Sequence, residues 1–343
     1  MKKAILILVI ISLSTHLYAQ DKKMTNDSIT VFYKQVFAAL KSDYLFKRTV
    51  DWKNVESHTR KNLNQYSNFE NSLIEISKLF DKIGANHTAI YFKGIKYAGA
   101  GNKISEPRYS DQWKKKYTAK PGFEVKMISE KYGYILVPGI IFFDVSSSNM
   151  HNIAQPWYDQ IAQIKKENKP EGWIIDLRLN TGGNSTPMLL ALYDFLGNQN
   201  IWTSLNFNRR VIDKMALDNG KYVLNGKTIS FINPEGNLLD QAKVAVITGP
   251  LTASSGEVTA LAFKDRPNTV FIGETTAGFT TGNIFYPLPF GVTMALTTTF
   301  DSDRNGIYHE KIIPDVAVSK QDNFDDLMLD KNIEEAIKFL SGQ

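Results

Sequence analysis

Two adjacent serines in residues 243–265, KVAVITGPLTASSGEVTALAFKD, are the side chains best placed to do chemistry. The apolar, β-branched run at 244–247 predicts a buried strand, and the apolar residues at 258–263 predict an interior helix. Ser254 and Ser255 are then expected at the N-terminus of that helix, where unpaired backbone N–H groups and the helix dipole favour negative charge. A serine hydroxyl held there could attack a carbonyl carbon, and the adjacent amides could stabilise the oxyanion.

The same residues also fit a purely structural role. Ser254 is followed three residues later by Glu257, which is the spacing of a capping box at a helix N-terminus. Taken alone, the local pattern favours capping over catalysis. The choice between the two roles therefore depends on the elements that surround this turn.

A second strand, glycine turn and helix precede the serines in the chain. Residues 173–177 predict a strand, the turn contains Asn180, Thr181, Gly182 and Gly183, and residues 188–196 predict a helix. Such alternation indicates an α/β domain with a mainly parallel sheet, whose strands end at one common edge. An amide of the glycine turn could then complete an oxyanion hole beside Ser254, although a simple tight turn also fits the pattern. The spacing of phosphate-binding glycine loops is absent.

The N-terminal part of the chain has a different pattern. Apolar residues at helical spacing predict helices near residues 29–40 and 71–83, and Gly84 fits the end of the second helix. We therefore expect a helical cap domain. His87 follows directly, before a predicted strand at 88–92. At such a junction the flanking elements can hold a histidine side chain in one orientation.

The remaining elements are expected as follows. Residues 93–120 contain Gly, Pro and many charges and are predicted to form a surface loop or linker. Further predictions are strands at 123–127, 134–137, 270–273 and 292–300, a helix beginning near Pro156, and a C-terminal amphipathic helix through Ile333, Ile337 and Leu340.

Composition excludes several classes of protein. The chain has 343 residues, 43% of them hydrophobic, a formal net charge of +5 and no cysteine. It can bury a sizeable core in one or two domains, its scattered lysines form no basic stripe for nucleic acid, and disulfides, thiol nucleophiles and cysteine-based zinc sites are ruled out. No His, Asp or Glu cluster has metal-ligand spacing, so no metal or organic cofactor is implied.

The first residues, MKKAILILVIISLSTHLYA, have a basic start, a short apolar run and a small residue before Gln20. This pattern predicts a cleaved secretory signal over residues 1–19. Its removal takes away Lys2 and Lys3 and lowers the formal charge from +5 to +3. No later segment is long and apolar enough to span a membrane, so we expect an exported protein, periplasmic or extracellular.

Several motifs in a fixed order carry a resemblance to a known family. DLRLNTGG, TASSGEVTALAFKD, VFIGETTAG and a Glu310-to-Asp315 segment of the form ExxIxPD resemble the tail-specific, or C-terminal processing, serine peptidases over roughly residues 132–318. The resemblance implies a Clp protease/crotonase-like α/β core. It also implies that Ser254 is the nucleophile and that the amide of Ser255 lies in the oxyanion hole.

The departures from the family pattern indicate a particular branch. Phe279 stands where many members have the lysine of a Ser/Lys pair, and the segment between the helical region and the core is too short for a PDZ domain. A second branch, similar to the core of the tricorn protease, uses histidine and glutamate instead of lysine. His87 and Glu310 match those positions, and imidazole is a suitable base near neutral pH.

Alternatives to these two residues remain. His309 is a rival base, but it is adjacent to Glu310 and so faces the other side of a strand. Asp315 could replace Glu310 as the acid, whereas its place after Pro314 favours a turn-forming role, and Glu310 could be a solvated surface charge. His87 could also be a buried or junction-capping histidine, and Gly183 could belong to a simple tight turn without a catalytic role.

The sequence thus predicts a signal peptide at 1–19, a helical cap domain at 20–92, a linker at 93–122, a catalytic domain at 123–320 and a C-terminal helix at 321–343. The predicted function is a serine-type endopeptidase with Ser254, His87 and Glu310 as its catalytic set and Gly183 and Ser255 amides as its oxyanion hole. Its partner is a peptide or protein substrate, and the oligomeric state, including a homo-oligomer, is left open. The alternatives are a catalytically inactive ligand-binding relative and a crotonase-like thioester enzyme.

Overall fold

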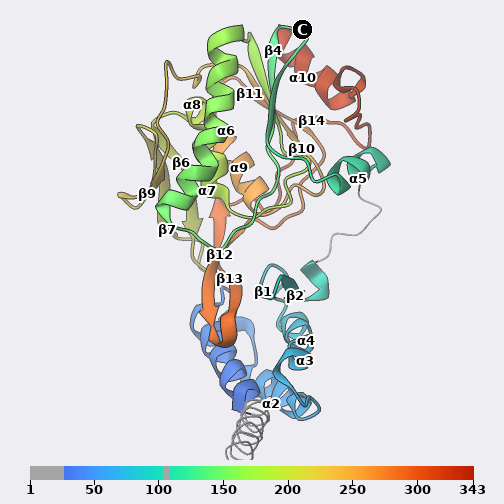
Figure 1. The fold of residues 1–343 in the computed structure, drawn as a ribbon, viewed down its shortest axis with the longest axis vertical. Coiled ribbons are helices and arrows are strands. Elements are labelled where there is room, and N and C mark those ends of the chain that lie inside the picture. Colours follow the sequence, from blue (N-terminus) through green and yellow to red (C-terminus); the bar gives the residue numbers. More distant parts are fainter. Residues whose placement is uncertain (1–26, 103–108) are drawn as a thin grey trace, which may run out of the picture. The chain divides into compact units, whose positions relative to one another are not determined.

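The computed structural model describes residues 27–102 and 109–343, which form two compact units (Figure 1). The first unit contains the N-terminal part of the chain and Asn283–Thr298, and the second contains Ile104–Gly282 and Thr299–Gln343. The predicted signal peptide lies outside the described residues. In the part described, no helix is long and apolar enough to cross a membrane.

A six-stranded sheet organises the second unit, with strand order β14-β11-β10-β5-β4-β3. The strands are β3 (Glu124–Ile128), β4 (Tyr132–Leu136), β5 (Gly172–Asp176), β10 (Val244–Thr248), β11 (Thr269–Gly273) and β14 (Val316–Ala317). All neighbours are parallel except β3, which is antiparallel to β4. The predicted α/β core is therefore confirmed.

Apolar residues on both faces of this sheet are buried, which accounts for the unbroken apolar run of β10. Val244 and Val246 pack in one core with helices α6 (Ser147–Asn168), α7 (Ser185–Ala191), α8 (Tyr193–Leu196) and α9 (Ser255–Phe263). Ala245 and Ile247 pack in another core with α5 (Asp111–Thr118) and α10 (Lys331–Ser341). In Figure 1, α6, α7 and α9 lie on one side of the sheet and α5 and α10 on the other. The alternation follows from the two-residue period of a strand.

An antiparallel meander covers the outer side of the first of these cores. It consists of β6 (Gln199–Leu205), β7 (Val211–Asp218), β8 (Lys221–Leu224) and β9 (Lys227–Phe231). Ile201, Met215 and Tyr222 place its buried face against the helices. The end of β13 (Val292–Ser302) pairs with β6 through Phe300–Ser302.

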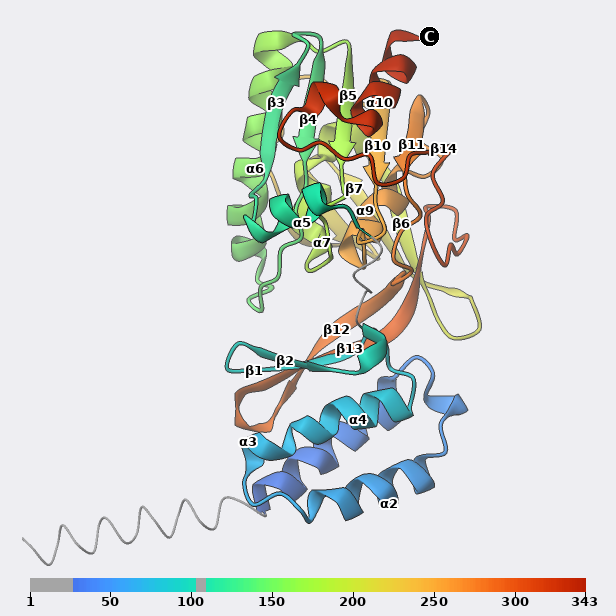
Figure 2. The same ribbon diagram turned by 90° about the vertical axis from the view of Figure 1, so that its right-hand side faces the viewer.

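The first unit contains the predicted helical region together with strands. Residues 27–43 are helical and are followed by η1 (Lys47–Thr49), α2 (Trp52–Leu63), α3 (Phe69–Ser72) and α4 (Ile74–Lys82). Then come β1 (Ala89–Phe92), β2 (Ile95–Ala98) and η2 (Ala100–Asn102). β1 pairs with β2 on one side and with Thr293–Ala295 of β13 on the other. The helices cover one face of these strands (Figure 2).

Strands β12 (Thr281–Leu288) and β13 belong to both units, because the chain leaves the second unit at Gly282 and returns to it at Thr299. Between them lies the short turn η4 (Pro289–Gly291). Leu288, Val292 and Met294 fill the core of the first unit.

Two local expectations differ from the structure. The helix expected to begin near Pro156 begins at Ser147, because the hydroxyl of Ser146 accepts a bond from the N–H of Asn149. Met150 and Ala154 in its first turns are buried, and Ala154 packs in the core. The segment 93–122 contains β2, η2 and α5, the last of which is capped by Ser110 and anchored by buried Trp113. α10 is preceded by the short η5 (Leu327–Leu329).

Candidate active site

Ser254 lies in the turn between β10 and α9, in the second unit. Its φ of 52° and ψ of −117° are outside the regions that non-glycine residues normally occupy, and its side chain is half-buried. Such strain costs about 1–3 kcal/mol and persists where the surroundings over-determine the conformation. In α/β-hydrolases the nucleophilic serine is presented on a similarly sharp strand-to-helix turn.

Contacts with the loop after β5 hold this turn in place. The N–H of Ala253 donates to the carbonyl of Asn180 at 3.0 Å, and the hydroxyl of Thr252 donates to the carbonyl of Leu177 at 2.9 Å. A Cβ on Gly256 would lie 2.5 Å from the same Asn180 carbonyl oxygen, so the first turn of α9 fits closely over that loop. The two loops that the sequence placed at one edge of the sheet are thus in direct contact.

The glycine turn packs against Ser254. Gly182 and Gly183 have φ of +109° and +118°, which side chains rarely tolerate. A Cβ on Gly182 would lie 2.8 Å from Ser254 Cβ and 3.4 Å from its Oγ, and one on Gly183 would lie 1.8 Å from the carbonyl oxygen of Ile140. Glycine is required at both positions because backbone or the serine occupies the space of a side chain.

Ser255 and Gly183 are joined by a hydrogen bond. The buried hydroxyl of Ser255 donates to the carbonyl oxygen of Gly183 at 2.6 Å. The N–H of Gly182 donates to Asn180 Oδ1 at 3.1 Å, and the carbonyl of Gly182 accepts from the N–H of Ile140 at 3.1 Å. Ser254, Ser255 and the Gly182–Gly183 turn therefore lie next to one another.

Glu257 is buried beneath this turn. Its carboxylate accepts bonds from the N–H of Ser254 at 3.0 Å, the hydroxyl of Thr276 at 2.6 Å and the N–H groups of Gly278 and Phe279 at 2.8 and 2.7 Å. Burial raises the pKa of Glu257 to about 7, while these four bonds oppose the rise. Glu257 therefore ties the serine turn to residues 276–279.

Glu310 and its neighbours lie in the same unit. Glu310 is exposed, its carbonyl accepts from the hydroxyl of Thr280 at 3.1 Å, and a Cβ on Gly278 would lie 3.5 Å from that carbonyl oxygen. His309 Nε2 lies 2.8 Å from the buried carboxylate of Asp303. The carboxylate of Asp315 accepts from the N–H of Phe271 in β11 at 2.8 Å, so its side chain is bonded to the backbone of that strand.

His87 lies in the first unit, between α4 and β1, and is half-buried. Its carbonyl accepts from Asn283 Nδ2 at 2.9 Å. The next residue, Thr88, is buried, and its hydroxyl bonds to Thr297 Oγ1 at 3.1 Å and accepts from the N–H of Thr297 at 3.2 Å. The chain at His87 and Thr88 is thus fixed to the β12–β13 strand pair.

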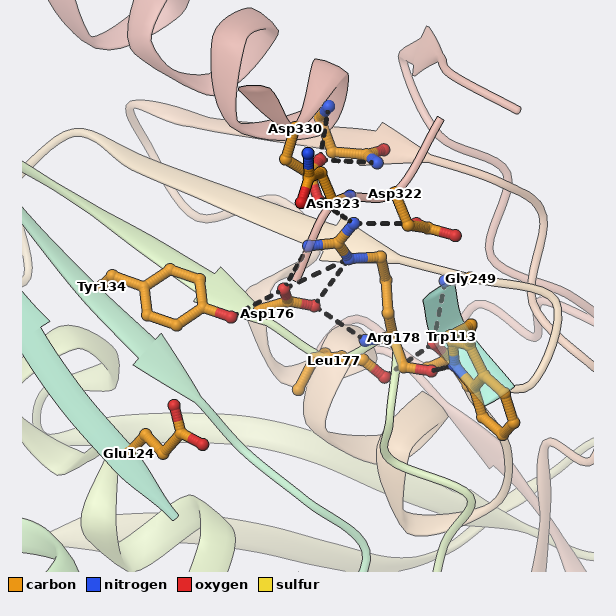
Figure 3. Close-up of polar contacts among 12 residues, drawn as sticks. Trp113, Glu124, Tyr134, Asp176, Leu177, Arg178, Gly249, Asp322, Asn323 and Asp330 are labelled. Atoms are coloured by element: carbon orange, nitrogen blue, oxygen red, sulfur yellow. Dashed lines mark hydrogen bonds and ion pairs between the residues drawn. The ribbon is translucent and has the colours of Figure 1, made fainter. Parts of the chain in front are cut away.

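A buried ion network supports the base of the glycine turn (Figure 3). Arg178 is 2% exposed and bonds to Asp176 through Nε and Nη2, with a closest distance of 2.6 Å. Its Nη1 lies 2.8 Å from Asp322 and 2.7 Å from Asp330. Asp330 is also the N-cap of α10, and the indole of Trp113 donates to the Arg178 carbonyl at 2.7 Å. This network fixes the chain two residues before Asn180.

Neither this network nor the four bonds of Glu257 is evident from the sequence. The sequence does contain one signal of the network: Arg178 directly follows a predicted buried strand, and a buried arginine needs acidic or hydrogen-bonding partners. Its partners Asp322 and Asp330 are more than 140 residues away in the chain, so only the fold reveals them. Among the described residues, no group of three or more His, Asp or Glu side chains is arranged to hold a metal ion.

The sequence model of the family described as peptidase family S41 matches residues 131–318 of this chain. This chain belongs to peptidase family S41. The match spans β4, the glycine turn, the Ser254 turn and β14. It confirms the predicted relationship to tail-specific and C-terminal processing serine peptidases.

Individual proteins that this S41 chain resembles have low sequence identity to it. It is 34% identical over 152 residues to a nisin-resistance protein of Lactococcus lactis subsp. lactis, and this match covers 44% of the chain and 47%, about half, of that relative. A lipoprotein structure from Streptococcus agalactiae has 22% identity and a TM-score of 0.67, covering 91% of this chain and 95% of that one. A photosystem II D1 C-terminal processing protease has 14% identity and a TM-score of 0.52, covering 88% and 96%. These two structures support the fold.

Proposed function

We propose that this S41 member is an exported serine-type endopeptidase with Ser254 as nucleophile, His87 as general base and acid, and Glu310 as the group that orients the imidazole. The observation that carries the proposal is the contact between the strained Ser254 turn and the Gly182–Gly183 turn. The S41 assignment makes a serine peptidase the expected enzyme class.

The proposed reaction proceeds in two steps. Ser254 Oγ attacks the peptide carbonyl carbon while His87 takes its proton, and the N–H groups of Gly183 and Ser255 stabilise the oxyanion. The C–N bond then breaks, His87 protonates the leaving amine, and an acyl-serine ester remains. His87 then takes a proton from a water molecule, which attacks the ester carbon. As the acyl group leaves, His87 returns the proton to Ser254 Oγ.

The contacts of Ser255 favour Ser254 as the nucleophile. The Ser255 hydroxyl is buried and donates to Gly183, so its proton is engaged in holding the glycine turn. The exposed residue Glu310 is available to a histidine, whereas the carboxylate of Asp315 is bonded to the N–H of Phe271 in β11. These contacts support Glu310 over Asp315.

The proposed organisation assigns residues 1–19 to a signal peptide, 20–92 to a cap domain, 93–122 to a connecting segment, 123–320 to the catalytic domain and 321–343 to the C-terminal helix. The substrate class is a peptide or protein in the periplasm or outside the cell. Nisin, which appears in the name of one relative, is the first peptide to test.

The test is labelling of the protein with a fluorophosphonate probe, followed by mass mapping of the modified residue. We expect labelling at Ser254, none in Ser254→Ala, and a rate lowered by ~100- to 10,000-fold in His87→Ala. Cleavage of nisin or an unfolded protein, followed by mass spectrometry, should show the same dependence. A folded protein that is neither labelled nor able to cleave peptides would favour the ligand-binding alternative.

A further inference from the structure

Glu257 holds two loops together with a single carboxylate. Oε1 accepts from the hydroxyl of Thr276 and the N–H of Gly278, and Oε2 accepts from the N–H groups of Phe279 and Ser254. The residue is fully buried. All four partners are donors, and an ionised carboxylate has four acceptor sites for them.

The donor set favours the charged form of this carboxylate. Hydrogen bonds to an ionised acceptor are stronger than neutral ones, and the N-terminal turn of α9 adds its positive dipole end. Burial acts in the other direction and raises the pKa of Glu257 to about 7. The charge of Glu257 also raises the pKa of the buried carboxyl of Asp301, and the side chain of Lys311 lies beside Gly278.

We propose that Glu257 is a positioning residue for the reaction, which fixes the strained Ser254 turn to the 276–279 loop and so aligns the nucleophile with the Ser255 amide. This inference rests on the proposed function. It differs from simple helix capping, because only one of the four bonds is made to the N-cap residue and three reach across to another segment.

The same contacts connect Ser254 with the segment that carries Glu310. The N–H of Ile312 donates to Thr276 Oγ1 at 2.9 Å, and the N–H of Thr276 donates to the Ile312 carbonyl at 3.1 Å. Since Thr276 in turn donates to Glu257, the serine turn and residues 310–312 are held by one continuous set of bonds. Glu257 therefore controls the placement of two parts of the proposed site.

Glu257→Gln is the direct test. The amide keeps the size of the side chain but turns one acceptor oxygen into a donor that faces two donors. We expect at least a tenfold slower fluorophosphonate labelling of Ser254 and a lower kcat with little change in KM. Hydrogen exchange measured by mass spectrometry should show faster exchange of the Ser254 amide.

Glu274→Gln is the matched control. Glu274 is in the same segment, and its carboxylate accepts from the hydroxyl of Ser319 at 2.8 Å and the N–H of Lys320 at 3.4 Å, away from the serine turn. This variant should label at the wild-type rate. Thr276→Val, compared with Thr276→Ser, gives a milder second test if Glu257→Gln does not fold: the valine variant should label at least threefold more slowly than the serine variant.

The outcomes separate the two proposals. Wild-type labelling and exchange rates in Glu257→Gln would overturn the positioning role, as would equal labelling of Thr276→Val and Thr276→Ser. If wild-type protein is not labelled at Ser254, the proposed function fails. The exchange rate of the Ser254 amide then decides alone whether Glu257 holds the turn, and an unchanged rate overturns that role.

Discussion

Gly182 and Ser254 are in such close contact that a single added methyl group on Gly182 would overlap the serine, with 2.8 Å between the two Cβ atoms. The φ of +109° at Gly182 adds a second obstacle to any side chain. We predict that Gly182→Ala slows fluorophosphonate labelling of Ser254 at least tenfold, because either the serine or the glycine turn must move. The measurement is the labelling rate of the folded variant.

Gly226→Ala is a matched control for that prediction. Gly226 also has a positive φ, of +84°, but a Cβ there meets nothing within 4 Å. It should cost ~1–2 kcal/mol of stability from backbone strain and leave labelling unchanged. Equal labelling rates for the two alanine variants would contradict the steric role of Gly182.

Arg178→Met should destabilise the protein strongly, by about 3–5 kcal/mol, because it leaves buried carboxylates of Asp176 and Asp330 without their cation. The measurement is the free energy of unfolding in urea. As a control, Lys331→Met removes exposed ion pairs with Glu334 and Glu335 and should have little effect. Similar losses in both variants would mean that burial of the network does not matter.

Asp301→Asn should change how stability depends on pH. Burial, and secondly the charge of Glu257, hold the pKa of Asp301 well above its usual range, and its Oδ1 has no hydrogen-bond partner among the described residues. A carboxyl with a raised pKa in the folded state favours folding at low pH, and this contribution is lost as pH rises from the unfolded pKa, ~3.9, through the folded one. The stability of Asp301→Asn relative to wild type should therefore increase between pH 5 and pH 8 in urea unfolding experiments. A difference that is constant with pH would refute the raised pKa.

His309→Ala should retain the labelling of Ser254, whereas His87→Ala should lose it. His309 is bonded to Asp303, and Asp303 also accepts from the N–H groups of Asn305 and Ile307, so the pair stabilises a surface turn. Labelling rates of the two variants give the comparison. Loss of labelling in His309→Ala with an unaffected His87→Ala would exchange their proposed roles.

The elements nearest the site were the most predictable from sequence. β10 has a continuous apolar run because both its faces are buried, and the glycines at 182 and 183 mark a turn that only glycine can form. Local residue types specify these features directly. The contact between the two loops followed from the rule that parallel strands end at one edge of a sheet.

Features that depend on distant partners were not predictable. The meander of β6–β9 was not among the expected elements. In β7, for example, Val211 and Ile212 are exposed although apolar, so the order of apolar and polar residues does not follow the alternation of buried and exposed positions. α5 has a largely polar sequence with one buried anchor, Trp113, so its segment resembled a linker. The four bonds of Glu257 and the acids around Arg178 come from separate segments that only the folded chain brings together.

The first unit is assembled from two separate stretches of the chain, and this affects how its evolution and engineering can proceed. Residues 283–298 supply Leu288, Val292 and Met294 to its core, so an N-terminal fragment that ends near residue 103 would lack part of its own interior. The unit cannot be exchanged between homologues by a single crossover. A functional chimera must replace both stretches together, and a truncation before residue 283 should expose apolar surface and aggregate.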